Sequence, residues 1–269
     1  MTDHAPFAAR FSYGRLFADV GRVLARAWLA IAIGLGLGAV PLVLSALPWW
    51  SEPTYTPAFP QIWMTVTLAK TSVVLIAYAS LTVFVAAVAL KALGGATWRE
   101  MLRPRRLALG FITSLSVNLL ANWATLASPV ATVYARSVPL LWGLSLLPAL
   151  SVVLIAPIVG VAVSASVAEE AWVGPAIARS FRLLRGLRWR IVSLMLGYLL
   201  VLFLSEYSAA LGLALARVVY RTPGLGYAAL SLTTLPVSAL FDILVISFFV
   251  QARRIADGPS VGELHEVFA

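Results

Sequence analysis

The sequence predicts an all-α polytopic membrane protein with six transmembrane helices, amphipathic interfacial helices and both termini in the cytoplasm. The composition supports this class, because a soluble chain that is 61% hydrophobic and 12% charged would have more apolar surface than it could bury. The chain contains six apolar stretches, and each reaches the ~20 residues needed to cross ~30 Å of hydrocarbon. Sixteen of the twenty Lys and Arg residues lie in four short segments that alternate with these stretches.

The predicted spans belong to a single domain over residues 1–269. In chain order they are Ala27 to Leu47, Met64 to Leu90, Ala108 to Leu126, Val138 to Ser164, Ile191 to Ala216 and Ala228 to Val250. Outside the spans we expect three cytoplasmic pieces: an amphipathic helix at 1–26, an interfacial helix at 165–190 and a tail at 251–269.

The distribution of basic residues predicts the orientation. They fall before residue 27, from 91 to 106, from 179 to 190, and at 253 and 254. Lys and Arg near membrane spans are retained on the cytoplasmic side, so these segments and both termini are expected there. The connections on the other side are short, which leaves no room for an extracellular domain.

The segment before the first span has the pattern of an amphipathic helix. Ser12 is a suitable N-cap. Charged residues follow it at helical spacing: Arg15, Asp19, Arg22 and Arg26. An apolar set repeats the same spacing one residue later, so a charged face adjoins an apolar face. This helix could run straight into the first span or bend at the interface, and the sequence leaves both open.

The connection before the fifth span predicts a second amphipathic helix. Pro175 suits a first helical turn, and Gly186 is a suitable stop. Between them Arg179, Arg182 and Arg185 share one face, and apolar residues share another. A helix with this pattern is expected to lie in the membrane surface.

Seven arginines are candidate contacts for anionic lipid headgroups or for a membrane partner. They are Arg99, Arg103, Arg105 and Arg106 in the second connection, with Arg179, Arg182 and Arg185 in the fourth. Orientation and headgroup contact are one role for such residues, and docking of a phosphate-bearing ligand or partner is the other. Because the arginines lie beside spans, lipid is the nearer partner, and no nucleic-acid binding is expected.

Polar side chains inside the spans are the second group of candidates: Lys70, Asn118, Asn122, Glu206 and Asp242. Ionisable groups are costly against lipid, so we expect them to face the bundle interior. The first four could line a polar cavity for a small solute or a proton. Alternatively they lock helices together, with Lys70 extending toward the interface. For Asp242 we expect backbone or hydroxyl partners on neighbouring spans.

The chain offers little for catalysis. It has no cysteine, and its two histidines, His4 and His265, lie in the terminal tails. No Walker A motif, dinucleotide fingerprint or nucleophile elbow is present in its connections. We therefore expect a protein that is not an enzyme and that holds no metal or cofactor.

The stretch VAEEAWVGPAIARSFRLLRGLRWR, from Val167 to Arg190, resembles a segment of the YciC-like bacterial inner-membrane proteins. The patterned positions are Glu169 or Glu170, Ala176, Arg179, Ser180, Leu183 and Gly186. The ending FFVQARRIADGPSVGELHEVFA is also similar to that family's last span and tail. This superfamily includes the membrane domain attached to some glycerophosphodiester phosphodiesterases. The resemblance implies a six-helix domain of a bacterial inner membrane, without that enzyme's catalytic barrel or its catalytic residues.

Three functions follow as hypotheses. The first is a non-catalytic membrane protein that acts by association with anionic lipids or with a membrane partner, including a second copy of itself. The second is a small-solute transporter or permease component with a polar intramembrane cavity. The third is an accessory membrane domain for a separately encoded soluble enzyme.

Overall fold

The computed structural model describes residues 11–45, 60–94, 97–121, 160–215 and 223–257, and the elements in this part of the chain are all helices. They are α1 (Tyr13–Ser45), α2 (Pro60–Gly94), α3 (Trp98–Met101), α4 (Pro104–Ala121), α7 (Val173–Leu183), α8 (Arg188–Leu215) and α10 (Pro223–Asp257). A further apolar helix covers Gly160–Glu169. The predicted all-helical class is confirmed for the described residues.

Four helices in the described part of the chain are long and apolar enough to cross a membrane. Their spanning segments are Tyr13–Pro41 in α1, Met64–Gly94 in α2, Arg188–Gly212 in α8 and Leu232–Asp257 in α10. These segments match the first, second, fifth and sixth predicted spans. The chain is therefore a membrane-embedded helical protein.

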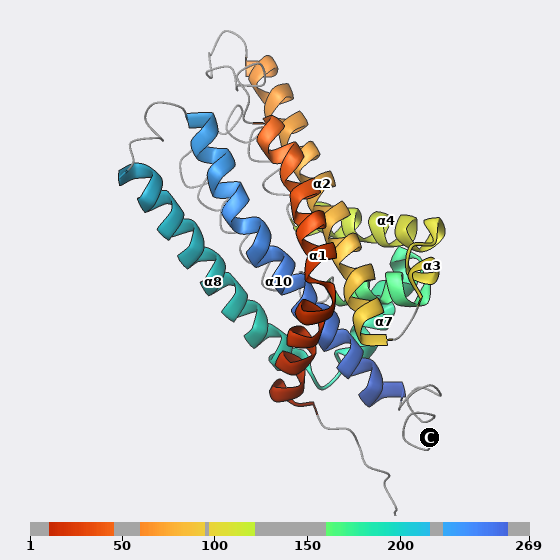
Figure 1. The fold of residues 1–269 in the computed structure, drawn as a ribbon. Coiled ribbons are helices and arrows are strands. Elements are labelled where there is room, and N and C mark those ends of the chain that lie inside the picture. Colours follow the sequence, from red (N-terminus) through yellow and green to blue (C-terminus); the bar gives the residue numbers. More distant parts are fainter. Residues whose placement is uncertain (1–10, 46–59, 95–96, 122–159, 216–222, 258–269) are drawn as a thin grey trace, which may run out of the picture.

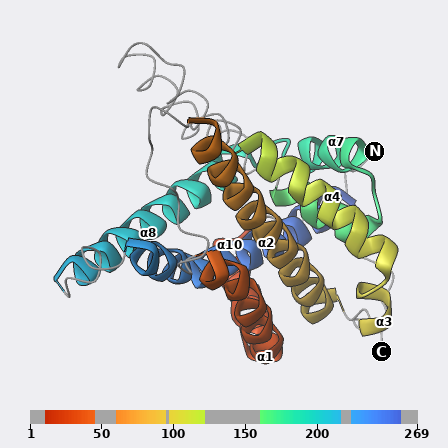
Figure 2. The ribbon, with the colours of Figure 1, turned by 90° about the horizontal axis from the view of Figure 1, so that it is seen from above.

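The long helices run side by side, and successive ones point in opposite directions (Figure 1). α1 and α8 begin, and α2 and α10 end, at the same end of the bundle. α10 packs against α1, α2 and α8. Seen from above, α8 lies on one side of α10 and α2 on another (Figure 2). This arrangement makes α10 the central helix of the described bundle and α8 a peripheral one.

The other two predicted spans are represented only in part. α4 covers residues 108–121 of the third stretch and packs on α2, and it lies across the long helices (Figure 1). It is not among the four helices that reach spanning length and apolarity. Of the fourth stretch, residues 160–164 belong to the helix Gly160–Glu169. The remainder of both stretches lies outside the described residues.

The N-terminal amphipathic segment and the first span form one continuous helix, α1. The backbone carbonyl of Ser12 accepts the first helical bond, from the amide of Leu16 at 3.1 Å. Leu16 and Val23 are fully buried, and Arg15 on the neighbouring face is exposed. Of the two alternatives that the sequence left open, the structure has the straight helix. The predicted apolar face is confirmed at Leu16 and Val23, whereas Asp19 of the predicted charged face is buried. Residues 1–10 of the helix expected at 1–26 lie outside the described part.

The beginning of α1 is fixed against the beginning of α8 and the end of α10. The guanidinium of Arg190 donates to the carbonyl of Phe11 at 2.9 Å and lies 5.0 Å from the centre of its ring. The Phe11 ring also packs on Phe248, with 4.9 Å between centroids. Parts of the chain that are distant in sequence thus meet at the end of the bundle that carries the basic residues, which we call the basic end.

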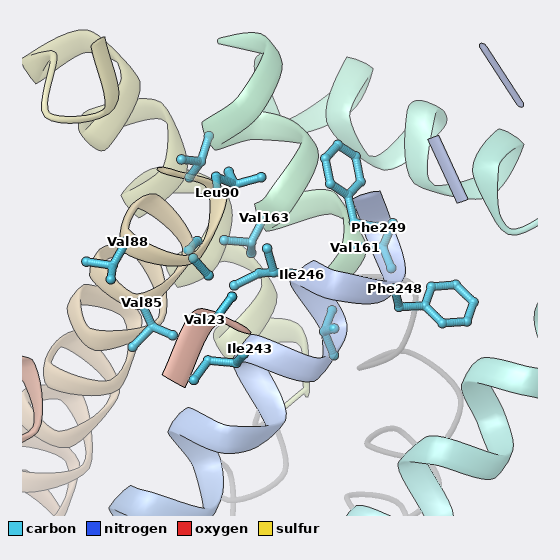
Figure 3. Packing of buried hydrophobic residues seen from close by; sticks show 14 of the residues in the cluster. Val23, Val85, Val88, Leu90, Val161, Val163, Ile243, Ile246, Phe248 and Phe249 are labelled. Carbon is cyan, nitrogen blue, oxygen red and sulfur yellow. The ribbon is translucent and has the colours of Figure 1, made fainter. Parts of the chain in front are cut away.

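The core lies where four helices converge. Figure 3 shows buried side chains from α1, α2, the helix Gly160–Glu169 and α10 packed together: Val23, Val85, Val88, Leu90, Val161, Val163, Ile243, Ile246, Phe248 and Phe249. Small residues allow this close approach. A Cβ placed on Gly34 would lie 2.6 Å from the Phe84 ring, and one on Gly160 would lie 2.9 Å from Val245. Close packing of small residues is the usual way that membrane helices associate.

The last helix is longer than the sixth predicted span. That span was expected to end at Val250 and to be followed by a tail over residues 251–269. Instead α10 continues to Asp257. The side chain of Gln251 is buried, and Arg253 and Asp257 make ion pairs with the fourth connection. These tertiary contacts keep the polar end of the helix in place. Residues 258–269 lie outside the described part.

Candidate functional site

The short helix α7 is held on the basic end by one of its faces. Ala176, Ser180 and Leu183 are buried, and their spacing of four and three residues places them on the same side of the helix. The helix ends at Leu183, and Gly186 follows with a φ of +88°, in the left-handed region that favours glycine. A helix followed by a turn at Gly186 is confirmed, but the element expected over 165–190 is divided, because its first residues belong to the helix Gly160–Glu169 and its last to α8. The position of α7 in the membrane surface stays a prediction.

Arg179 attaches α7 to two other elements. Its Nε lies 3.3 Å from Glu169 Oε1, and its Nη2 pairs with the carboxylate of Asp257 at the end of α10. The hydrogen bond that Arg179 donates to Asp257, followed by the charge of Glu169, raises the pKa of Arg179. Arg253 extends the group, with its Nε 3.8 Å from Glu169 and 3.7 Å from Asp257. Two carboxylates and two guanidinium groups therefore alternate at this point.

The adjacent residue, Glu170, makes a second connection. Its Oε1 accepts from Arg106 Nη2 at 3.0 Å and from Nε at 3.3 Å, and Arg103 lies 3.9 Å away. The Arg106 side chain is only 13% exposed. Glu170 has a φ of +52°, which is unusual for a residue with a Cβ. This backbone conformation turns the chain between the helix Gly160–Glu169 and α7, so that successive carboxylates reach different arginines.

We call Glu169, Glu170, Arg106, Arg179 and Asp257 the carboxylate clamp. It ties α4, α7 and α10 to the end of the helix Gly160–Glu169. The sequence suggested Arg106 and Arg179 as lipid or partner contacts, and the structure supplies carboxylate partners for both within the chain. Their pairing with Glu169, Glu170 and Asp257 was missed, although the Glu-Glu pair preceding an arginine helix was a visible signal.

The remaining candidate arginines face outward. Arg99, Arg105, Arg182 and Arg185 are exposed, as is most of Arg103. Exposed aromatic rings lie beside them in the chain: Trp98 and Phe181, with Trp172 60% exposed and Trp189 85% exposed. Rings of this kind together with arginine are typical of the boundary between hydrocarbon and headgroups.

Helix α3 is stabilised by its own cap. Thr97 accepts from the amide of Glu100, and the Glu100 carboxylate accepts from the amide of Thr97 at 3.0 Å. This capping box is a local device that satisfies backbone donors at a helix start. Two hydrogen bonds lower the pKa of Glu100: the larger effect comes from the one with the Thr97 backbone amide, and the next from the one with the Thr97 side chain. The cap fixes the turn that carries Arg99 and leads to Arg103.

No family model, curated protein or solved structure matches this chain. The YciC-like assignment stays a prediction. The geometry does give each patterned position a structural role, since Ala176, Ser180 and Leu183 are buried and Gly186 turns the chain.

The predicted intramembrane polar residues that the structure describes lie on four different helices, α2, α4, α8 and α10. Lys70 is half-buried on α2, and Glu206 is exposed on α8. Both helices pack on α10. Asn118 on α4 donates to the Ser114 carbonyl of its own helix at 2.9 Å. Asn122 lies outside the described residues. A shared cavity of Lys70, Asn118 and Glu206 stays a prediction, as does their pairing.

Asp242 has the kind of partner that the sequence predicted. Its side chain interacts with the hydroxyl of Thr82 on the neighbouring helix α2. Two further cross-helix hydrogen bonds lie on the same face of α10: Thr234 with Tyr78 on α2 at 2.9 Å, and Ser238 with Tyr198 on α8 at 3.3 Å. We call these three contacts the polar ladder. The tyrosines were missed, but Thr234, Ser238 and Asp242 at intervals of four residues were readable as a polar stripe.

The described residues contain no group of three or more His, Cys, Asp or Glu side chains that could hold a metal ion. The carboxylates of the clamp are paired with arginine side chains. The polar ladder contains one carboxylate, that of Asp242, next to hydroxyl groups.

Proposed function

We propose that this protein acts by association, and that the exposed arginines at the basic end bind anionic lipid headgroups. In this proposal it is an integral protein of a bacterial inner membrane, and its basic end and both termini face the cytoplasm. The proposal requires no catalysis and no cofactor.

The observation that carries the proposal is the exposure of Arg182 in the last turn of α7 and of Arg185 in the turn that follows it. The opposite face of the helix is buried, and Arg179 is held by the clamp. Arg182 and Arg185 are exposed beside Phe181, which is itself exposed. A helix end and a turn with outward guanidinium groups and an adjacent apolar ring match the headgroup region, where phosphate lies next to hydrocarbon.

Charge at the basic end also supports the proposal. The carboxylates of Glu169, Glu170 and Asp257 are already paired with arginines of the chain. They are therefore not available to neutralise Arg99, Arg105, Arg182 or Arg185. An anionic membrane surface attracts each nearby Lys or Arg by about 1 kcal/mol.

The test is thermal unfolding of the full chain in nanodiscs that contain phosphatidylcholine alone or with added phosphatidylglycerol. We expect the anionic lipid to raise the unfolding midpoint of the wild type. The double variant Arg182→Gln/Arg185→Gln should lose about 2 kcal/mol of this gain, at about 1 kcal/mol per arginine. The matched control, Arg182→Lys/Arg185→Lys, keeps the charge and should keep most of the gain. An equal gain in the Gln and wild-type proteins would contradict the proposal.

A further inference from the structure

The polar ladder brings oxygen atoms together inside the bundle. On α10, Ser238 and Asp242 are one helical turn apart, and on α2 Tyr78 and Thr82 are also one turn apart. Tyr198 reaches in from α8, bonds Ser238 and lies within electrostatic range of Asp242. Its ring stacks on Phe241 at 4.0 Å between centroids, which fixes the position of its hydroxyl group.

The charge of Asp242 is not balanced by a basic side chain of the described residues, since none of their ion pairs includes it. On α2, Lys70 precedes Thr82 by twelve residues, which is about 18 Å along a helix. On α10, Arg253 follows Asp242 by eleven residues, or about 16 Å. On α8 the other acidic group near Tyr198 is Glu206, which carries the same sign of charge as Asp242.

A carboxylate in a membrane-spanning segment is unfavourable unless a counter-charge accompanies it. Neutral hydroxyl groups can orient a carboxylate, but they do not cancel its charge. In its ionised form Asp242 therefore carries a negative charge that no ion pair among the described residues balances, and hydroxyl groups lie next to it. Hard oxygen ligands select protons and alkali or alkaline-earth ions over softer metals, and a single charge matches a monovalent ion.

We propose that Asp242, with the hydroxyl groups of Thr82, Ser238 and Tyr198, binds a small monovalent cation within the bundle, either a proton or an alkali-metal ion. This site is separate from the arginines of the basic end, and it does not depend on their binding lipid.

The first readout is labelling by dicyclohexylcarbodiimide, which reacts with protonated carboxyl groups in apolar surroundings. The full chain in phosphatidylcholine nanodiscs is treated in buffers of different pH, and at one pH with Na⁺, K⁺ or N-methylglucamine as the cation. Peptide mass spectrometry then locates the adduct. A bound proton predicts labelling of Asp242 that falls as the pH rises. A bound alkali ion predicts labelling that falls when that ion replaces N-methylglucamine.

The second readout is the thermal unfolding midpoint in the same buffers. A ligand that binds the folded chain raises the midpoint as its concentration increases. We expect a cation-dependent shift in the wild type and its loss in Asp242→Asn, which preserves side-chain size. Glu206→Gln is the matched control, since it removes a carboxylate outside the ladder, and its shift should be unchanged. Should Asp242→Asn fail to fold, Thr82→Val takes its place and should weaken the shift.

Two results would overturn the site. One is labelling of Asp242 that is the same at every pH and in every salt. The other is a midpoint that responds identically to these buffers in the wild type and in the ladder variants.

Discussion

The carboxylate of Glu170 meets the guanidinium of Arg106 at 3.0 Å, although the two residues are 64 positions apart in the chain. Glu170 holds this contact with a φ of +52°. The neighbouring Glu169 reaches Arg179 instead. A single turn of backbone therefore joins α4 and α7, and through Asp257 it also joins α10.

Breaking the contact between Arg106 and Glu170 should destabilise the bundle. Arg106→Gln and Glu170→Gln each remove a charged hydrogen-bonding partner, and we expect a coupling free energy of about 1–2 kcal/mol between them. The double-mutant cycle is measured by thermal unfolding in detergent micelles. Arg105→Gln is the control, because this neighbouring arginine is exposed, and its effect should stay within about 0.5 kcal/mol. Strictly additive effects of Arg106→Gln and Glu170→Gln would show that the pair does not hold the turn.

Gly186 and Gly174 should respond in opposite directions to alanine. Gly186 has a φ of +88°, so Gly186→Ala should cost about 1–2 kcal/mol of stability. Gly174 lies inside α7 with no atom within 4 Å of an added Cβ, so Gly174→Ala should be neutral or stabilise by up to about 1 kcal/mol. Unfolding midpoints of the two variants check this contrast. A harmless Gly186→Ala would mean that α7 does not end in this turn.

Gly34 and Gly36 differ in their surroundings on α1. A Cβ on Gly34 would come within 2.6 Å of the Phe84 ring, whereas one on Gly36 would have nothing within 4 Å. Gly34→Ala should therefore force α1 and α2 apart and cost about 1–3 kcal/mol. Gly36→Ala should have little effect. If both variants unfold at the wild-type midpoint, α1 does not pack on α2 through Gly34.

The absence of cysteine makes the membrane position testable by single-cysteine labelling. Ala178 on α7 and Leu37 on α1 are both exposed at the protein surface. A charged, membrane-impermeant maleimide should label Ala178→Cys, because that position faces water or headgroups. It should not label Leu37→Cys, because that position faces hydrocarbon. With sealed vesicles, labelling of Ala178→Cys from the cytoplasmic side alone is expected. Labelling from the opposite side alone would reverse the proposed orientation.

Much of the fold could be predicted from the sequence, because bilayer thickness relates apolar length directly to a spanning helix. This relation identified α1, α2, α8 and α10. It could not decide whether the amphipathic start of α1 bends, because that depends on contacts such as the bond from Arg190 to Phe11. It also could not extend α10 to Asp257, since the polar end of that helix is held by tertiary ion pairs.

For the candidate site, the sequence predicted the residue types but not which side chains pair with one another. Helical spacing placed Arg179, Arg182 and Arg185 on one face of a helix, but Arg185 lies in the turn after α7. Spacing also could not separate a paired arginine from exposed ones. That separation depends on Glu169 and Asp257, which are distant from each other in sequence. Hydroxyl partners for Asp242 were expected on general grounds, and the choice of Thr82 follows from how α2 and α10 pack.

The central claim is that Arg182 at the end of α7 and Arg185 in the turn after it bind anionic lipid. Native mass spectrometry of the protein released from its own membrane tests this most directly, by recording the lipids that stay bound to the wild type and to Arg182→Gln/Arg185→Gln. Our account predicts that anionic phospholipid is retained by the wild type and is lost from the double variant. Equal retention in both proteins, or no anionic lipid on either, would contradict it.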